Sequence, residues 1–329
     1  MSSVSTEARR CAARVAPLDP ATYARHAIHG TERTWTQTNC YTDLVIELVH
    51  GLGNDPCAML PFTLAIDFEG DQWTFFKPSH HDLSMLYGLD VQELAMWKDP
   101  IEHVCEQVGA GRPVLIELDS FWLPDTSGTA YRTAHQKTTV GVNEIDVERG
   151  YMAYFHNQGF FAVEGEDFRK LFELPGLPPY VEFVKPVPNF IRRTQNELLD
   201  CSLALLKAHL ARAPRENPFV RFKARLVEDL ESLLAADMDH FHKYSFATLR
   251  QYGACFELAE TYLEWLAVKS ITGLEMPRSA FATISQTAKA FQFQLARSMT
   301  RKKTLDLAPL DTMAAQWDVG MTLLQSRYA

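Results

Sequence analysis

The sequence predicts an α+β protein with a mixed domain over residues 33–188 and an all-α helical bundle over residues 189–329, after an N-terminal extension over residues 1–32. In the mixed domain, strand-like runs alternate with segments of helical period, whereas from Asn189 onward apolar residues recur almost only at helical spacing. Between the two parts lie five prolines, Pro175, Pro178, Pro179, Pro186 and Pro188. Proline breaks helices and stiffens connections, so the boundary is predicted near residue 188.

The composition is that of a folded protein with a large core. The chain has 329 residues, of which 47% are hydrophobic, enough for one large domain or two of ordinary size. Residues 1–20 lack the apolar run of a signal peptide, and no run reaches the roughly 18 residues of a membrane span. We therefore expect a cytoplasmic protein that does not bind membranes. The formal net charge of −9 argues against general nucleic-acid binding, which needs a basic face.

Neither the cysteines nor the glycines form a cofactor motif. The six cysteines, at positions 11, 40, 57, 105, 201 and 255, include no C-x-x-C pair, so we expect reduced thiols and no structural zinc. Gly51-Leu52-Gly53 is too short for a dinucleotide fingerprint. His80-His81 is interpreted as a solvated loop, and the aspartates of residues 237–242 as a helix N-cap. No metal and no cofactor are predicted.

The most informative helix begins around Cys40. Leu44, Val45, Leu48, Val49 and Leu52 recur at helical spacing, with Thr38 and Asn39 upstream as N-cap candidates and Gly51 and Gly53 as stop signals. The pattern therefore places Cys40 in the first turn. Free backbone N–H groups and the positive end of the helix dipole stabilise a thiolate there. Gln37, one turn upstream, carries an amide that can donate to an oxyanion beside that sulfur.

The other elements follow from the same periodicities. Strands are predicted at residues 59–68, 72–76, 114–119, 137–142 and 151–155, and a further helix at residues 101–108. In the bundle, five helices are predicted at residues 191–211, 218–235, 240–271, 277–301 and 310–327. Pro218 and Pro277 fall in first turns, where proline is tolerated.

Three polar residues of the mixed domain can form a nucleophilic site. His135 precedes the strand at residues 137–142, and Asn157 follows the strand at residues 151–155. In an antiparallel hairpin the start of one strand neighbours the end of the next, so we expect His135 and Asn157 within hydrogen-bonding reach. With Cys40 they match a Cys-His-Asn site, in which the imidazole takes the thiol proton and the amide orients the imidazole.

The motifs around these residues also carry a family resemblance. They are Asn39-Cys40 opening a helix, the strand and loop ELDSFWLP at residues 117–124, and His135 followed by TTVGV at residues 138–142. With them, residues 33–175 resemble a papain-like fold, and more narrowly the N-terminal domain of the butirosin-biosynthesis type of acyltransferase, which moves an aminoacyl group from a carrier-protein thioester to an amine. The run DFEGDQWTFFKP at residues 67–78 resembles an uncharacterised bacterial family sometimes found beside carrier proteins.

The resemblance implies a role for each matched residue. Cys40 maps to the nucleophile and His135 to the base, while Asn157 matches papain-type enzymes and many relatives use Asp at that place. Gln37 departs from the pattern, because papain-type enzymes place the oxyanion glutamine further upstream. Asp119 matches an acidic residue at the strand end.

With Asp125 and Tyr131, Asp119 is expected to line the pocket mouth and to hold an acceptor ammonium.

The resulting hypothesis is a thiol-dependent acyltransferase that moves an aminoacyl group from an acyl or aminoacyl carrier protein to a small amine. A cysteine peptidase or amidase would use the same three residues with water as acceptor. A non-catalytic binding module would keep the fold with an unreactive Cys40. An acidic carrier could dock on the basic residues that cluster at the start of the bundle: Arg192, Arg193, Lys207, Arg212, Arg215, Arg221, Lys223 and Arg225.

Overall fold

The computed structural model describes residues 11–36, 39–174, 176 and 178–328. The chain forms two units, each discontinuous in sequence. Unit 1 comprises Met1–Gly30, Asn39–Pro56 and His80–Arg193, and unit 2 comprises Thr31–Thr38, Cys57–Ser79 and Thr194–Ala329. The sequence boundary near residue 188 lies close to the last of these crossings. Two shorter segments, 31–38 and 57–79, belong with the helical unit rather than with the sheet.

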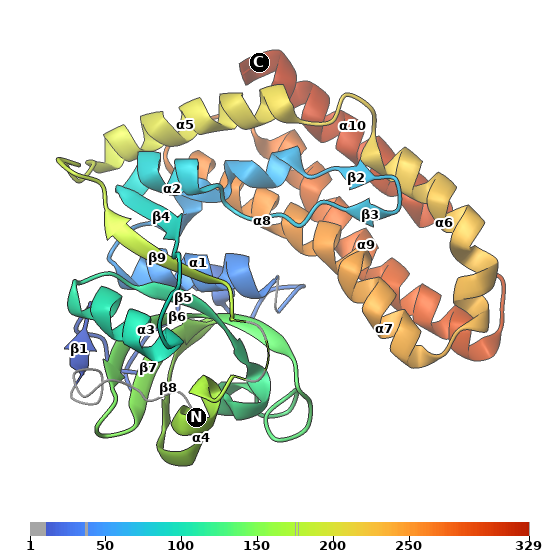
Figure 1. Cartoon of the computed structure of the whole chain (residues 1–329). Helices are drawn as coiled ribbons and strands as arrows, with labels where there is room; N and C mark the ends of the chain where they lie inside the picture. The colour runs from blue at the N-terminus through green and yellow to red at the C-terminus, as the bar shows by residue number, and fades with distance from the viewer. Residues whose placement is uncertain (1–10, 37–38, 175, 177, 329) are drawn as a thin grey trace. The chain divides into compact units, whose positions relative to one another are not determined.

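Unit 1 is an α+β domain built on one antiparallel sheet (Figure 1). Its strands are β1 (Ala12–Arg14), β4 (Leu89–Glu93), β5 (Val114–Asp119), β6 (Lys137–Asp146), β7 (Tyr151–His156), β8 (Gly159–Glu164) and β9 (Val181–Pro186). Their order is β4-β9-β5-β6-β7-β8, and β1 pairs with the far end of β6. The strands predicted at residues 114–119, 137–142 and 151–155 are confirmed.

Helices cover both faces of the sheet. On one face, strand residues such as Ile116 and Val140 pack against α3 (Pro100–Gly109) and α4 (Gly165–Phe172). On the other lies α1 (Cys40–Gly51), since a Cβ on Gly141 would lie 3.4 Å from Leu44 Cδ1 and 3.3 Å from Leu115 Cδ2. Successive side chains alternate across a strand, so every second residue of β5 and β6 faces α1.

Helix α1 starts where the sequence predicts. The Asn39 side chain caps it by accepting the backbone N–H of Thr42 at 2.8 Å. Residues Leu44, Val45, Leu48 and Val49 are buried, as their spacing requires. Helix α2 (His80–Tyr87) packs against β4 and begins at His80, so the prediction of a solvated loop there is wrong.

Unit 2 contains six α-helices among the described residues: α5 (Gln195–Arg212), α6 (Pro218–Ala235), α7 (Met238–Ala247), α8 (Leu249–Val268), α9 (Glu275–Arg301) and α10 (Ala308–Tyr328). The helix predicted at residues 240–271 is two helices, because the backbone at Thr248 leaves the helical region, with φ −118° and ψ −85°. Asp237 caps α7 through the His240 N–H, which confirms the N-cap interpretation.

The segment before β2 differs from its prediction. Residues Pro56–Ala65 form a 3-10 helix, η3, instead of a strand, and only the hairpin β2 (Phe68–Glu69) and β3 (Gln72–Trp73) is extended. A short, wholly apolar run does not distinguish a buried strand from a buried helix. Pro61 lacks the N–H that a central strand needs, which favours the helical form. In the parts of the chain that the structure describes, no helix combines the length and apolar character that crossing a bilayer requires.

Candidate active site

A histidine-carboxylate pair stands at one end of the sheet of unit 1. His135 Nδ1 lies 2.6 Å from Asp119 Oδ2. The other oxygen, Oδ1, accepts the backbone N–H groups of Phe121 at 3.1 Å and Gln136 at 3.3 Å. The imidazole stacks on the Phe121 ring at a centroid distance of 4.3 Å. With Nδ1–H donated to the carboxylate, Nε2 carries the lone pair of a base.

Strand pairing explains this position. Asp119 ends β5 and caps the short helix η4 (Ser120–Trp122), and the β5–β6 register sets Asp119 opposite Lys137. His135 lies two residues before that partner, at the same end of the sheet. Asp119 is four residues after Leu115 on β5, so the two side chains point to the same face of the sheet. Leu115 lies on the face covered by α1, and the Asp119 carboxylate therefore lies on that face too. The His135 side chain is 69% exposed, so a substrate can reach it.

Cys40 is the first residue of α1, on the same side of the sheet. It is half-buried, unlike Cys57, Cys105, Cys201 and Cys255, which are buried. Burial raises the pKa of the Cys105 and Cys255 thiols, so their thiolates are disfavoured. Cys11 is also half-buried, and burial raises its pKa as well. Gln37, the proposed oxyanion donor, lies outside the described residues.

Asn157 occupies a different environment from the one expected. It lies in the tight turn between β7 and β8 with a left-handed φ of 46°, a conformation that Asn tolerates. Its amide nitrogen is 3.4 Å from His156 Nδ1. Among the described residues, the hydrogen bond of His135 goes to Asp119 and none joins it to Asn157.

The opposite face of the sheet holds a second histidine-carboxylate pair. His156 Nδ1 is 2.6 Å from Asp125 Oδ2, and its Nε2 is 2.8 Å from Thr138 Oγ1. Tyr154 donates to Asp125 Oδ1 at 2.6 Å. The side chains of His156 and Asp125 are 1% and 3% exposed. Tyr154 belongs to the core cluster under α3 and α4, so this pair lies across the sheet from Cys40.

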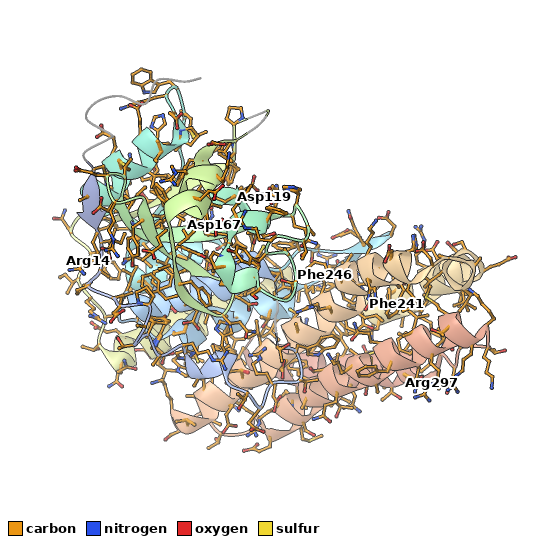
Figure 2. All side chains as sticks on the ribbon, turned by 90° about the horizontal axis from the view of Figure 1, so that it is seen from below. Arg14, Asp119, Asp167, Phe241, Phe246 and Arg297 are labelled. Carbon is orange, nitrogen blue, oxygen red and sulfur yellow. The ribbon has the colours of Figure 1, made fainter. Side chains whose placement is uncertain are left out.

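The residues expected at a pocket mouth are therefore separated. The Asp125 carboxylate is occupied by His156 and Tyr154, away from His135. The Tyr131 hydroxyl donates to Asp167 of α4 at 2.8 Å, and the same carboxylate pairs with Arg132. Figure 2 labels Asp119 and Asp167 among the side chains of unit 1. Of the three, Asp119 alone contacts the imidazole of His135.

Two polar clusters that the sequence did not reveal hold α1 in place. Near its first turn, Tyr41 donates to Glu182 Oε2 at 2.9 Å, and His80 Nε2 lies 3.1 Å from Glu182 Oε1. Burial alone would raise the pKa of Glu182, but hydrogen bonds from His80 and Tyr41 lower it below its ordinary value. Glu182 is paired with Leu115 across the strands, so it also faces α1. His80 is thus a second imidazole on this face.

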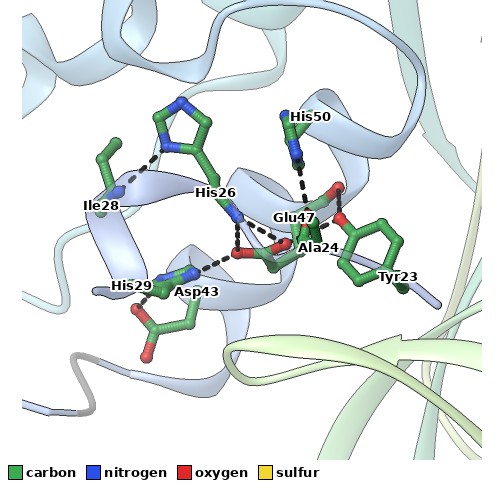
Figure 3. A network of polar contacts seen from close by, with 8 residues as sticks. All are labelled: Tyr23, Ala24, His26, Ile28, His29, Asp43, Glu47 and His50. Atoms are coloured by element: carbon green, nitrogen blue, oxygen red, sulfur yellow. Dashed lines mark hydrogen bonds and ion pairs between the residues drawn. The ribbon is translucent and has the colours of Figure 1, made fainter. Parts of the chain in front are cut away.

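The other cluster surrounds His29 (Figure 3). His29 Nδ1 bonds Glu47, and its Nε2 is 3.3 Å from Asp43 Oδ1; all three side chains are at most 1% exposed. Burial opposes the charge on His29, but the two carboxylates raise its pKa above the ordinary 6.5. Tyr23 donates to Glu47 Oε2 at 2.7 Å. Because both imidazole nitrogens face carboxylates, the cluster is an internal ion network that anchors residues 23–29 on α1.

Two family models cover most of the chain. The DUF1839 N-terminal domain matches residues 24–186, and the DUF1839 C-terminal domain matches residues 195–326. No curated protein matches the chain. Together the two domain matches identify the chain as a member of the DUF1839 family.

Proposed function

We propose that this protein is a thiol-dependent acyltransferase with a papain-like first domain, in which Cys40 is the nucleophile and His135 the base. The observation that carries the proposal is the hydrogen bond between His135 and Asp119, on the sheet face covered by the helix that begins at Cys40. Asp119 replaces Asn157 as the third member of the proposed site. A carboxylate on Nδ1 holds the imidazole in the tautomer that leaves Nε2 free to accept a proton.

The proposed reaction has two steps. His135 Nε2 takes the thiol proton, and the Cys40 thiolate attacks the carbonyl carbon of an acyl thioester. The carbon–sulfur bond of the donor breaks, the departing thiolate receives the proton from His135, and an acyl-Cys40 thioester remains. An amine then attacks the acyl carbon while His135 accepts its proton, and the Cys40 thiolate leaves and regains that proton. Backbone N–H groups at the start of α1 are the proposed oxyanion donors.

The proposed donor is an aminoacyl group on a carrier protein, and the acceptor a small amine. The basic cluster offers less free charge than the sequence suggests, because Arg221 pairs with Asp67, Lys223 with Asp311 and Arg225 with Asp229.

Lys207 and Arg215 are exposed and, among the described residues, form no ion pair, so they are the better candidates for contact with an acidic carrier.

A mass measurement tests the proposal. Incubation with an alanyl N-acetylcysteamine thioester should add one alanyl group to the protein, mapped to Cys40 and absent from Cys40→Ser. Adding a small amine such as putrescine should remove the group and yield the alanyl amide. Cys11, which is also half-buried, is the internal control and should remain unmodified. A wild-type protein that acquires no acyl group, or acquires it equally at Cys11, would refute the nucleophile assignment.

A hydrolase is the second candidate, and the exposure of His135 to solvent favours it. Water would then resolve the acyl-enzyme, and free alanine would form at the same rate with and without the amine. If Cys40 remains unmodified while the protein still binds the thioester, the non-catalytic binding module is the correct interpretation.

A further inference from the structure

Unit 2 contains a cavity of about 280 Å³ that the proposed acyl transfer does not use. Its wall is formed by the end of η3, by residues 74–79 that follow β3, and by the last turn of α5. Residues far apart in sequence thus line one hollow. All of the lining residues belong to unit 2.

The lining of the cavity includes basic side chains. Lys77, His209 and Arg212 line it, and none of the lining residues is acidic. Arg212 Nη2 donates to His209 Nδ1 at 3.1 Å, which fixes the guanidinium beside a buried imidazole. Among the described residues, no carboxylate forms an ion pair with Arg212, and it is exposed. A lining with two basic residues, Lys77 and Arg212, and no acidic residue favours an anion.

The lining is also aromatic. Phe62, Phe75 and Phe76 line it, and the Phe62 and Phe76 rings stack with an interplanar angle of 17°. Phe75 is 53% exposed although it is one of the larger apolar side chains. Covering an exposed ring with a second ring removes apolar surface from water and gains offset stacking. The wall therefore favours a ligand with a flat apolar body.

Two other cavities of unit 2 lack this combination. A hollow of about 440 Å³ and another of about 220 Å³ both include Asp306 in their lining, and neither includes an aromatic residue. An anion would meet an uncompensated carboxylate in the larger hollow. The smaller hollow also has Arg297 and Lys303 in its lining, so what it lacks for an aromatic anion is the aromatic surface. The cavity at Arg212 is also slightly smaller than the roughly 300 Å³ at which drug-sized ligands begin to fit, so its ligand has about one ring.

We propose that this cavity binds a small aromatic anion, a single ring bearing a carboxylate or a phosphate, with the acid group on Arg212 and Lys77 and the ring against Phe75 and Phe76. The guanidinium fork matches either acid group, because both present two oxygens in one plane. This site is independent of Cys40, so its presence or absence does not bear on the acyl-transfer proposal.

The test uses the full chain and three fluorinated probes observed by fluorine NMR: 4-fluorobenzoate, 4-fluorophenyl phosphate and the neutral 4-fluorobenzyl alcohol. At least one anion should bind with a dissociation constant on the order of 1 mM or tighter, and which of the two binds more tightly identifies the acid group. Arg212→Gln should raise the dissociation constant of the anion by about tenfold or more and leave that of the alcohol unchanged. Phe75→Ser should weaken the binding of all three probes, because each carries the ring.

Arg215→Gln is the matched control, because Arg215 is also exposed, three residues further along the chain and outside the cavity lining. It should bind as the wild type does. Inorganic phosphate should compete only weakly, since it lacks the ring. Three results would each overturn the proposal: no binding of either anion, equal loss in Arg212→Gln and Arg215→Gln, or inorganic phosphate binding as tightly as 4-fluorophenyl phosphate.

Discussion

His135 Nδ1 and Asp119 Oδ2 lie 2.6 Å apart at the end of β5. Two backbone N–H groups donate to the other oxygen of the same carboxylate and hold it in place. The pair is therefore preorganised by the strand end itself. This arrangement makes Asp119 a residue that orients His135, whereas the sequence suggested that it would hold the acceptor amine.

The two roles predict different kinetics for Asp119→Asn. If Asp119 orients the imidazole, acyl transfer should slow by about a hundredfold or more at an unchanged KM for the amine, because the tautomer is no longer fixed. Steady-state rates against amine concentration make the measurement. Glu117→Gln is the control, since Glu117 pairs with Lys137 on the same face and should leave the rate nearly unchanged. A higher KM with an unchanged kcat would restore the acceptor-binding role.

The pair of His156 and Asp125 should contribute to the stability of the fold and not to the reactivity of the Cys40 thiol. Asp125→Ala leaves a buried imidazole and the Tyr154 hydroxyl without their acceptor, and should lower the free energy of unfolding by about 3 kcal/mol. Urea denaturation measures this. Alkylation of Cys40 in the folded variant should proceed at the wild-type rate, because the two sites lie on opposite faces of the sheet. A folded Asp125→Ala protein with a slowed Cys40 would contradict this separation.

The cluster of His29, Asp43 and Glu47 predicts a bell-shaped stability contribution. The folded pKa of His29 is raised, so its contribution is complete below 6.5 and is lost as the pH rises through the folded value. Burial opposes the charge on Glu47, but hydrogen bonds from His29 and Tyr23 lower its folded pKa, so its contribution is complete above 4.5 and is lost as the pH falls through the folded value.

The stability difference between wild type and Glu47→Gln should therefore be largest between pH 4.5 and pH 6.5. Urea denaturation from about pH 4 to about pH 9 measures it, with a plateau of about 3 kcal/mol expected for breaking a buried ion network. Glu173→Gln, which removes an exposed pair with Lys170, should give a small difference at every pH. A difference for Glu47→Gln that does not vary with pH would show that His29 is not charged in the folded protein.

Close packing around Trp35 supplies a test of unit 2. A Cβ on Gly253 of α8 would lie 2.6 Å from Trp35 Cε2, and Trp35 is buried, with its indole N–H donated to Ser285 Oγ at 3.0 Å. Gly253→Ala should lower the free energy of unfolding by about 2 kcal/mol through overpacking, measured by urea denaturation. Gly109→Ala, where a Cβ would meet nothing within 4 Å, should be neutral or slightly stabilising. Equal effects of the two substitutions would contradict the packing of Trp35 against α8.

The sequence predicted the helices whose positions are set by local signals such as a cap, a proline or an apolar period. The period of residues 44–52 and the cap at Asn39 were enough to place α1, and Pro218 was enough to place the start of α6. The break at Thr248 was missed because the apolar period continues through it, and a kink of that kind is decided by packing. The 3-10 helix at Pro56–Ala65 was missed because a continuous apolar run has no period.

The site was harder to predict because it depends on strand order. His135 was expected beside Asn157 because those residues flank a local hairpin, β6–β7. The pairing that decides the partner of His135 is instead between β5 and β6, and it sets Asp119 opposite Lys137. Both pairings form, but the β6–β7 register sets Gly141 opposite Phe155, so His135 lies beyond the end of β7. Nothing local in the sequence gives this register. The buried clusters of His29 and His156 likewise join residues from separate segments.

The most direct test of the central claim is the rate of Cys40 alkylation by iodoacetamide against pH, mapped by peptide mass in wild type, His135→Ala and His80→Ala. His80 is the matched control because it is another imidazole near the start of α1, held by Glu182, and unlike His29 it is partly exposed. If Cys40 and His135 form one site, the wild type and His80→Ala should react rapidly near about pH 6, His135→Ala should react at least about tenfold more slowly there, and all three should converge near about pH 9. A wild-type Cys40 that reacts slowly at the lower pH, with a profile that His135→Ala does not change, would contradict the claim and leave Cys40 as a packing residue of α1.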